Sequence, residues 1–496
     1  MRIFKILTLV ILFVFFASLL IHGLNSINQD IGRHIKSGQI IWETKRVYKT
    51  NLFSFTEPEK EFINHHWLSE VVFYGLNNAL GLRGLILFKT AIILLAIGLL
   101  FASIYPGTRL WPLILSSLAG FIVFIERTDV RPEIFSYLFL AYFLFVIFKT
   151  KYTWTSDVVS KKWLYTLPFA QIFWTNMHIY FALGPILLFF FSVDRFFEKR
   201  DKFKITSYVL LATAAATLLN PNFIKGALVP FNILRHYGYS IVENQNIFFL
   251  RDYGVSLQSI NLFQISLVIL LVSFMIAFHN GRKKITFELF TATFMSIMAI
   301  KMFRNFGIYA LTFIPIVSLN LSTITLLTTR RVVRPLISKS FYPAISVLLM
   351  FLIWNNINSP RFGLSIPTGA KKAVEFVKTN NIKGPVFNNF DVGSFLIWKL
   401  YPEQKVFVDG RPEAYTVDFF EKIYKPMQIN PELWKKYSEE YKINYIFFDH
   451  KDITPWAQSF LVQISKNPDW PLIYLDESVT IFIKKNLENK NIEFIF

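Results

Sequence analysis

Long apolar runs recur from the N-terminus to Trp354, and they restrict the fold more than any other feature of the sequence. The runs are roughly 12 to 22 residues long, which approaches the length of a helix that crosses a bilayer. They are Ile3–Leu24, Leu85–Tyr105, Leu110–Ile125, Ile134–Phe148, Leu164–Thr175, Tyr180–Val193, Ile205–Leu219, Ile260–Phe278, Phe287–Ile300, Phe306–Leu327 and Phe341–Trp354. The sequence is 53% hydrophobic with 55 phenylalanines, which is more apolar surface than soluble cores require. We predict an α-helical polytopic membrane protein with about eleven transmembrane helices.

Much of the net charge of +19 lies in basic clusters within four connections between these runs. The clusters contain Lys149, Lys151, Lys161 and Lys162; Arg195, Lys199, Arg200, Lys202 and Lys204; Arg282, Lys283 and Lys284; and Arg330, Arg331, Arg334 and Lys339. With a cytoplasmic N-terminus and about eleven spans, all four clusters lie in the cytoplasm, as the positive-inside rule requires. Membrane topology therefore explains the basic excess, and nucleic-acid binding is not expected.

Two segments near the N-terminus need separate interpretations. The first apolar run follows Met1-Arg2 and has no small-residue cleavage site after it, so we expect a retained signal anchor; a cleaved signal peptide is the alternative. Trp67–Leu80 has helical apolar spacing interrupted by polar residues, and we expect an amphipathic helix in the outer membrane interface. The predicted transmembrane domain covers residues 1–357, with a first external loop over residues 25–82.

Residues 358–496 have the composition of a soluble α/β domain, which the same topology places outside the cytoplasm. The runs "GPVFNN", "KVFVDG", "NYIFFDH" and "VTIFIKK" predict strands, and "GAKKAVEFVKTN" predicts a helix. Asp409, Gly410 and Arg411 end one predicted strand, a position where α/β sheets commonly bind ligands. An Asp–Arg pair within a turn is the structural alternative. The sequence has no cysteine, so this domain has no disulfides.

Ionisable residues concentrate in the connections predicted to be external. They are Asp30, Arg33, His34, His65, His66 and Glu70 in the first; Arg127 and Arg131 in the second; His178 in the third; and Lys301 and Arg304 in the fifth. Such residues at the membrane edge are costly and often mark pathways or reactive sites. Each alone has a structural alternative, as an interfacial anchor or a local ion pair. Their shared side makes the set a candidate site.

The residue types indicate transfer of a group from a phosphorylated lipid. Asp30 and His34 are four residues apart and share one face of a helix. A carboxylate at the edge of a partly dehydrated cavity can accept a proton from a hydroxyl, so Asp30 is a candidate general base and His34 an orienting partner. Arginine grips phosphate bidentately and lysine acts as a point charge, which suits Arg127, Arg131, Lys301 and Arg304 to a phosphate or pyrophosphate.

The remaining candidates are His65, His66, Glu70 and His178, which we assign to substrate binding. A divalent metal held by the histidines and carboxylates of the first loop is an alternative use of these side chains. Adjacent histidines on a helix rarely aim at one ion, and no spacing here matches a zinc signature.

Several segments resemble a known superfamily. "DIGRHIKSGQII", "TNLFSFT" and "HHWLSEVVFY" in the first loop are similar to the bacterial GT-C membrane glycosyltransferases of the dolichyl-phosphate-mannose mannosyltransferase type, which use polyprenyl-phosphate sugars. "VRPEIFSYLFL", "FWTNMHIYFALG" and "FRNFGIYALTFIP" resemble later elements, and residues 387–415 resemble an attached C-terminal domain. The resemblance covers most of the chain. It implies Asp30 as general base, inversion at the sugar, and Arg304 with Lys301 at the leaving phosphate.

We therefore predict a hexosyltransferase of the bacterial inner membrane that moves a sugar from a polyprenyl-phosphate donor to an extracytoplasmic glycan, lipid or protein acceptor. Two alternatives belong to other classes. A transporter of lipid-linked or small polar substrates would show inverted repeats and ionisable residues near the bilayer midplane, neither of which is evident here. A non-catalytic assembly or sensor protein would use the outer domain to bind partners.

Overall fold

The structure is a computed structural model that describes residues 2–24, 30–104, 108–153, 157–198, 200–232, 235–324, 333–366, 369–487 and 489. Lys199, Arg330 and Arg331 of the predicted basic clusters lie outside the described residues, as do residues 25–29 and 490–496. The chain divides into two compact units. We call them the helical unit (Met1–Gly23, Leu85–Pro230 and Ile241–Leu364) and the α/β unit (Leu24–Gly84, Phe231–Ser240 and Ser365–Phe496).

This division differs from the predicted domains in one respect. The first external loop was assigned to the transmembrane domain, whereas Leu24–Gly84 packs with Ser365–Phe496 in one compact unit. The predicted boundary between residues 357 and 358 lies close to the change of unit after Leu364. The domain limits themselves stay predictions.

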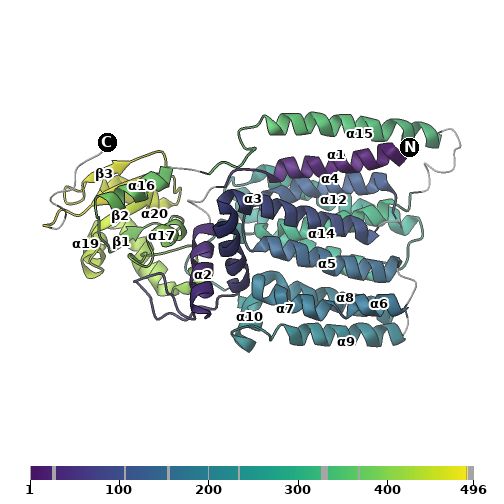
Figure 1. Cartoon of the computed structure of the whole chain (residues 1–496), viewed down its shortest axis with the longest axis horizontal. Coiled ribbons are helices and arrows are strands. Elements are labelled where there is room, and N and C mark those ends of the chain that lie inside the picture. The colour runs from purple at the N-terminus through teal and green to yellow at the C-terminus, as the bar shows by residue number, and fades with distance from the viewer. Residues whose placement is uncertain are drawn as a thin grey trace. The chain divides into compact units, whose positions relative to one another are not determined.

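The helical unit contains a helix at every predicted apolar run. Its elements are α1 (Arg2–Leu20), the later part of α3 (Trp67–Ile104), α4 (Leu110–Phe124), η1 (Ile125–Arg127), α5 (Glu133–Tyr152), α6 (Asp157–Leu164), α7 (Leu167–Met177), η2 (Ile179–Ala182), α8 (Leu183–Phe196), α9 (Arg200–Ala216), α10 (Phe223–Asn232), η3 (Val242–Asn244), α11 (Ile247–Asp252), α12 (Leu257–His279), α13 (Thr286–Lys301), η4 (Phe303–Asn305), α14 (Phe306–Leu321) and α15 (Val333–Ile357). In Figure 1 the long helices of this unit run side by side.

In the part of the chain that the structure describes, 7 helices are long and apolar enough to cross a membrane. They coincide with the predicted runs at α1, α3, α4, α5, α8, α12 and α15. The predicted runs at α7, α9, α13 and α14 form helices of 11, 17, 16 and 16 residues. These helices are shorter than the 18 residues that a candidate span requires. The protein is a multi-pass helical membrane protein, and the count of about eleven spans stays a prediction.

Packing within the helical unit separates a buried centre from an apolar surface. Helix α14 packs against α4, α5, α12 and α13, and nearly all of its residues are buried. Gly120 of α4 permits this close approach, because a Cβ there would lie 2.7 Å from Ile314 of α14. Large apolar side chains such as Phe169, Leu211 and Met275 are exposed on other helices. An exposed apolar surface of this extent suits contact with lipid.

Helix α3 contains the break that the sequence suggested between Trp67–Leu80 and the next apolar run. Gly81 has φ 66° and ψ −174°, a conformation outside the helical region that glycine adopts without the steric cost of a Cβ. The segment before it belongs to the α/β unit, and Leu85 begins the following stretch of the helical unit. The predicted position of Trp67–Leu80 in the membrane interface stays a prediction.

The α/β unit is built on a four-stranded sheet with the order β1-β2-β4-β3. Its elements are α2 (Ile31–Thr44), α16 (Gly369–Thr379), β1 (Val386–Asn388), α17 (Gly393–Leu400), η5 (Pro412–Ala414), η6 (Phe419–Tyr424), α18 (Lys425–Ile429), α19 (Pro431–Glu440), β2 (Tyr445–Asp449), α20 (Pro455–Ile464), β3 (Leu472–Leu475) and β4 (Val479–Ile483). Strands β1 and β2 are parallel, and β4 pairs antiparallel with both β2 and β3.

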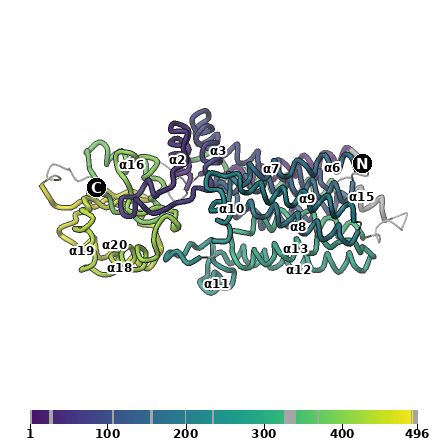
Figure 2. The backbone as a smooth tube through the Cα atoms, turned by 90° about the horizontal axis from the view of Figure 1, so that it is seen from below, coloured from purple at the N-terminus to yellow at the C-terminus, as the bar shows by residue number. Residues whose placement is uncertain are grey.

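Both faces of this sheet are covered, which explains why its strands are apolar without alternation. Tyr445 and Phe447 lie in one core with α16 and α17, and Ile446 and Phe448 lie in a second core with α19 and α20. In Figure 2, α16 lies apart from α18, α19 and α20, which lie together. The predicted strands "GPVFNN", "NYIFFDH" and "VTIFIKK" and the helix "GAKKAVEFVKTN" are confirmed.

The predicted strand "KVFVDG" is not a regular strand, because other groups take its backbone hydrogen bonds. Val406 forms an isolated parallel bridge with Ser54 of the first loop, donating to Phe53 O at 3.0 Å. The Asn388 side chain accepts from Phe407 N at 2.9 Å and donates to Val408 O at 2.7 Å. The first loop is thereby joined to the C-terminal residues by main-chain hydrogen bonds.

Candidate functional site

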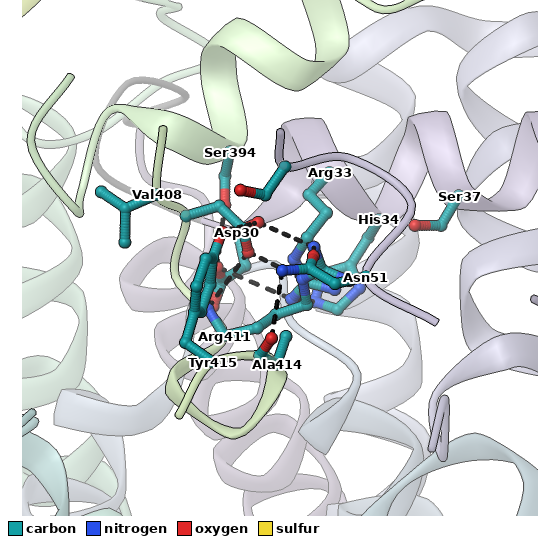
Figure 3. A network of polar contacts seen from close by, with 12 residues as sticks. Asp30, Arg33, His34, Ser37, Asn51, Ser394, Val408, Arg411, Ala414 and Tyr415 are labelled. Carbon is teal, nitrogen blue, oxygen red and sulfur yellow. Dashed lines mark hydrogen bonds and ion pairs between the residues drawn. The ribbon is translucent and has the colours of Figure 1, made fainter. Parts of the chain in front are cut away.

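Asp30 begins α2, and the packing of that helix brings it to α17. Gly32 allows the contact, because a Cβ at this position would lie 2.7 Å from the carbonyl oxygen of Ser394. Ser394, in the first turn of α17, donates its hydroxyl to Asp30 Oδ1 at 3.0 Å (Figure 3). The Asp30 carboxylate makes no side-chain capping hydrogen bond to α2 within the described residues. Asp30 is therefore turned toward the C-terminal part of the unit.

Arg33 lies between two carboxylates that differ in exposure. Its Nη2 is 3.6 Å from Asp30 Oδ1, and its Nη1 is 3.3 Å from Glu70 Oε1. The Asp30 side chain is 32% exposed, whereas the Glu70 side chain is fully buried. Of these two carboxylates, only Asp30 is open to a substrate.

His34 is held by Glu70 in one tautomer. Glu70 Oε1 is 2.9 Å from His34 Nδ1. Because a carboxylate can only accept, Nδ1 carries the proton and donates a hydrogen bond to Glu70. Arg33 Nη2 is 3.4 Å from His34 Nε2, which can accept a hydrogen bond only when unprotonated. Burial, together with the Arg33 guanidinium, lowers the pKa of His34, and Glu70 only partly offsets them. His34 is thus a neutral, buried residue that supports Arg33.

The two adjacent histidines lie beside this group. The His66 ring contacts the His34 ring edge-on, with ring centroids 5.5 Å apart, and His65 and His66 have ring centroids 3.9 Å apart. Asn64 donates to Glu70 Oε2 at 2.6 Å. Asp30, His34, His65, His66 and Glu70 of the predicted site are therefore brought together within the α/β unit.

Arg411 and Asp409, for which an Asp–Arg pair within a turn was the structural alternative, lie close to this group. Arg411 Nε and Nη2 donate to the two Asp409 carboxylate oxygens, each at 2.7 Å, and Nη2 also donates to Asn51 Oδ1 at 2.8 Å. Tyr415 donates to Asp409 Oδ2 at 2.9 Å. Arg411 is 1% exposed. The structural alternative, an Asp–Arg pair in a turn, describes these two residues.

A second cluster lies within the helical unit and is rich in arginine. Arg127 Nη2 donates to both oxygens of Glu133 at 3.0 Å, and Arg127 Nη1 is 2.9 Å from Glu243. Arg131 Nη1 donates to the same Glu243 carboxylate at 2.7 Å. Arg304 donates to Asn244, the neighbour of Glu243, at 3.0 Å. Three of the four predicted phosphate-binding residues thus meet around one carboxylate.

Glu243 was not predicted, because a single acidic residue in a connection carries no local pattern. Burial opposes its ionisation, but the Arg127 and Arg131 guanidiniums outweigh burial and hold the pKa of the Glu243 carboxyl well below its usual range. Among the described residues, the buried Nε atoms of Arg127, Arg131 and Arg304 have no hydrogen-bond partner. The cluster retains donors that its own acids do not satisfy.

His178 and Lys301 lie differently from the arginines. His178 Nδ1 is 2.9 Å from Ser136 Oγ, and its ring contacts Tyr180, whose hydroxyl donates to Arg304 O at 3.2 Å. His178 is buried and contacts Tyr180, which in turn contacts the main chain of Arg304. Lys301 is exposed at the last residue of α13. Its predicted contact with a phosphate stays a prediction.

Predicted cytoplasmic connections also meet one another in the helical unit. Lys151 at the end of α5 donates to Asp194 of α8 at 2.8 Å and to Glu288 of α13 at 2.7 Å. Arg282, after α12, lies 3.1 Å from Glu288. In these ion pairs each basic side chain contacts an acidic one, and the pairs connect the ends of neighbouring helices. We interpret them as structural contacts.

Within the described residues, the structure has no group of three or more His, Cys, Asp or Glu side chains placed to hold a metal ion.

The sequence analysis did not single out Lys89, which is buried. Lys89 donates to Leu20 O at 2.6 Å and lies 3.1 Å from His22 Nε2. No local pattern distinguishes this lysine, since it stands alone in an apolar run.

Known structures resemble the chain over nearly its whole length. The oligosaccharyltransferase AglB from Archaeoglobus fulgidus, in complex with an inhibitory peptide and a dolichol-phosphate, matches with a TM-score of 0.63 at 10% identity, covering 97% of this chain and 74% of that one. ArnT from Cupriavidus metallidurans, bound to undecaprenyl phosphate, matches with a TM-score of 0.56 at 10% identity, covering 96% and 97%. The arabinofuranosyltransferase AftD from Mycobacteria matches with a TM-score of 0.53 at 13% identity, covering 97% and 41%.

No protein-family model and no curated protein matches the chain by sequence. The structural matches show that the chain has the fold of the GT-C membrane glycosyltransferases, as its sequence motifs led us to expect. At these low identities the likeness concerns the fold, and activity has to be argued from the site itself.

Proposed function

We propose that the protein is an integral-membrane glycosyltransferase that moves a sugar from a polyprenyl-phosphate donor to an extracytoplasmic acceptor. The observation that carries the proposal is Asp30, a partly exposed carboxylate fixed at 3.0 Å by Ser394 and at 3.6 Å by Arg33. A carboxylate that is restrained and still open to solvent meets the geometric requirement of a general base. The neighbours AglB and ArnT, solved with dolichol-phosphate and undecaprenyl phosphate, support the class of donor.

In the proposed reaction Asp30 removes the proton from an acceptor hydroxyl. The acceptor oxygen attacks the anomeric carbon as the bond from that carbon to the phosphate oxygen breaks, which inverts the configuration. The polyprenyl phosphate leaves with the bonding electron pair, and the proton stays on Asp30 until solvent removes it. Arg33 and Ser394 stabilise the carboxylate, while His34 keeps Arg33 in place. We assign His65, His66 and Glu70 to the walls and support of this site.

The arginine cluster is our assignment for the phosphate. Arg127, Arg131 and Arg304 exceed the two acids that face them, and their unsatisfied N–H groups suit the oxygens of a phosphomonoester or phosphodiester. Lys301 is a weaker candidate because it is exposed, and His178 acts through Tyr180. The proposed location is the bacterial cell membrane, with the N-terminus in the cytoplasm and the C-terminal domain, residues 358–496, outside.

The test uses the full-length protein purified into lipid nanodiscs and a panel of undecaprenyl-phosphate hexoses. Release of undecaprenyl phosphate with an extract of cell-envelope acceptors would support the proposal, and mass spectrometry of envelope glycans with and without the gene would identify the product. If no panel member is consumed, and the envelope glycans of the deletion strain match the parent, the glycosyltransferase assignment is wrong.

A further inference from the structure

We propose that the C-terminal part of the α/β unit supplies two positioning residues, Ser394 and Gly410, that fix the Asp30 carboxylate. The inference rests on the proposed role of Asp30 as general base and deepens it. It gives the C-terminal residues a part in catalysis other than covering the site or holding an acceptor. The supporting contacts all lie within the α/β unit.

Ser394 contributes a directed donor. Its hydroxyl reaches Asp30 Oδ1 at 3.0 Å across 364 residues of sequence. The position of this hydroxyl is set by main-chain packing, because α2 and α17 approach so closely at Gly32 that a Cβ would touch the Ser394 carbonyl. Ser394 is 1% exposed, so water cannot readily replace it. A hydrogen bond to a carboxylate from a buried hydroxyl orients the carboxylate and favours its ionised form.

Gly410 contributes space. An ideal Cβ at Gly410 would lie 2.5 Å from Asp30 Oδ1 and 3.5 Å from Ser394 Oγ. The Asp30 carboxylate therefore rests against the Gly410 main chain in the volume that any other residue would fill. The nearest atom to that Cβ is the end of a side chain, so an alanine here would displace the carboxylate rather than the backbone.

The main chain at Gly410 is held rigidly on both sides. Asp409 before it and Arg411 after it are buried and joined by two hydrogen bonds of 2.7 Å, and Asn51 of the first loop binds Arg411 at 2.8 Å. Arg411 N also donates to Asp409 O at 2.7 Å. The buried pair of Asp409 and Arg411 therefore fixes the Gly410 main chain, which the Asp30 carboxylate contacts.

The ionisable groups that surround Asp30 come from several elements. Arg33 and His34 lie on α2, Glu70 lies on α3, and Asp409 with Arg411 lie in the segment behind Gly410. Of these, Arg33 gives the nearest opposite charge and remains in place in variants of Ser394 or Gly410. A change of activity in a Ser394 variant therefore reports on the Ser394 hydroxyl, and a change in a Gly410 variant reports on the space beside the Asp30 carboxylate.

The test compares Ser394→Ala, Ser394→Thr and Gly410→Ala in the nanodisc transfer assay. Gly410→Ala should lower kcat by roughly a hundredfold, because a misplaced catalytic group can cost that much. Ser394→Ala should lower kcat by roughly tenfold and move the acid limb of the pH–rate profile upward by about one pH unit, since the ionised carboxylate loses a donor. Ser394→Thr should restore most of both. Binding of undecaprenyl phosphate should stay at the parental level in all three.

Matched controls are Gly75→Ala, where an added Cβ meets nothing within 4 Å, and Ser459→Ala, where an exposed hydroxyl bonds Pro455 O of its own helix. Both should retain parental kcat. Asp30→Asn separates the two ideas. Parental activity in Asp30→Asn would remove the base assignment, whereas an inactive Asp30→Asn with parental Ser394→Ala and Gly410→Ala would overturn the positioning inference alone.

The absence of cysteine offers a readout that needs no substrate. The double variant Asp30→Cys with Ser394→Cys should form a disulfide on mild oxidation, detected by mass spectrometry of peptides from the full-length protein. Asp30→Cys with Ser459→Cys should not. Equal cross-linking of both pairs, or none of the first, would overturn the inferred contact.

Discussion

The two polar clusters carry opposite excess charge, although both mix acids with arginines. In the α/β unit, the carboxylates of Asp30 and Glu70 face one guanidinium, that of Arg33. In the helical unit, three guanidiniums face the carboxylates of Glu133 and Glu243. An excess of carboxylate suits a group that must accept a proton, and an excess of guanidinium suits an anion. The difference teaches that the balance within a cluster, more than the presence of charge, indicates its chemistry.

The largest expected effect tests the acidic side of this comparison. Asp30→Asn keeps the size of the side chain but cannot accept the hydroxyl proton, so kcat should fall by roughly a hundredfold to ten-thousandfold. Undecaprenyl phosphate should bind with unchanged affinity in nanodiscs. Because the Asn side-chain oxygen can still accept the Ser394 hydroxyl and the side chain is 32% exposed, thermal stability should change little. A loss of phosphate binding equal to the loss of kcat would mean that the two clusters do not divide the work as proposed.

The second effect tests the basic side. Arg304→Gln should raise the Kd for undecaprenyl phosphate by roughly tenfold or more, the usual effect of losing a hydrogen bond to a charged group. Arg304 is the best choice because it binds the neutral Asn244, so its loss leaves no acid without a direct partner. The matched control is Arg251→Gln, an exposed arginine that binds Asn261 and Gln264. Equal affinity in the two variants would reduce Arg304 to a structural residue.

A smaller effect, of opposite sign, sharpens the comparison. Glu243→Gln removes the carboxylate that occupies Arg127 and Arg131, so undecaprenyl phosphate should bind roughly threefold to tenfold more tightly. Glu126→Gln removes the same charge from an exposed position beside Arg127 and should change the Kd little. Weaker binding in Glu243→Gln would show that the carboxylate holds the arginines in their binding geometry.

The smallest effect concerns acid stability in the α/β unit. His34 has a lowered pKa in the folded protein, so its contribution to stability is fully present above its unfolded value of about 6.5 and is lost as the pH falls below it. Between pH 7.5 and 5.5 the free energy of unfolding should fall by roughly 1 kcal/mol more in the parent than in His34→Gln. Thermal unfolding of both proteins, with exposed His279→Gln as control, measures the difference. Identical slopes would contradict a buried, neutral His34.

Sequence patterns predicted the helices well because a helix that faces lipid must be apolar along its whole length. Every apolar run from Ile3–Leu24 to Phe341–Trp354 contains a helix, and the break at Gly81 falls between two predicted segments. Strands buried on both faces were recognisable for the same reason. The error at "KVFVDG" arose because an apolar run gives no sign of its partners, and here the partner is Ser54 in the first loop.

The candidate site was predicted in part. Asp30, Arg127, Arg131 and Arg304 stand out because they are charged residues beside apolar runs. Ser394, Gly410 and Glu243 did not, since a serine, a glycine or one acid has many uses and its role depends on contacts distant in sequence. The hydrogen bond from Ser394 to Asp30 joins residues 364 positions apart, and local periodicity contains no information about such a pair.

That same separation has a consequence for the order of synthesis. Asp30 emerges early, but Ser394, whose hydroxyl binds its carboxylate, is made 364 residues later. At typical translation rates this interval is roughly 20 to 70 seconds. During that time α2 has no α17 to pack against, so Asp30 lacks its partners from the C-terminal part of the α/β unit while the helices of the helical unit are still being produced. The nascent chain should therefore be unable to transfer sugar, and a chain that stops before α17 should remain inert however well its helices insert.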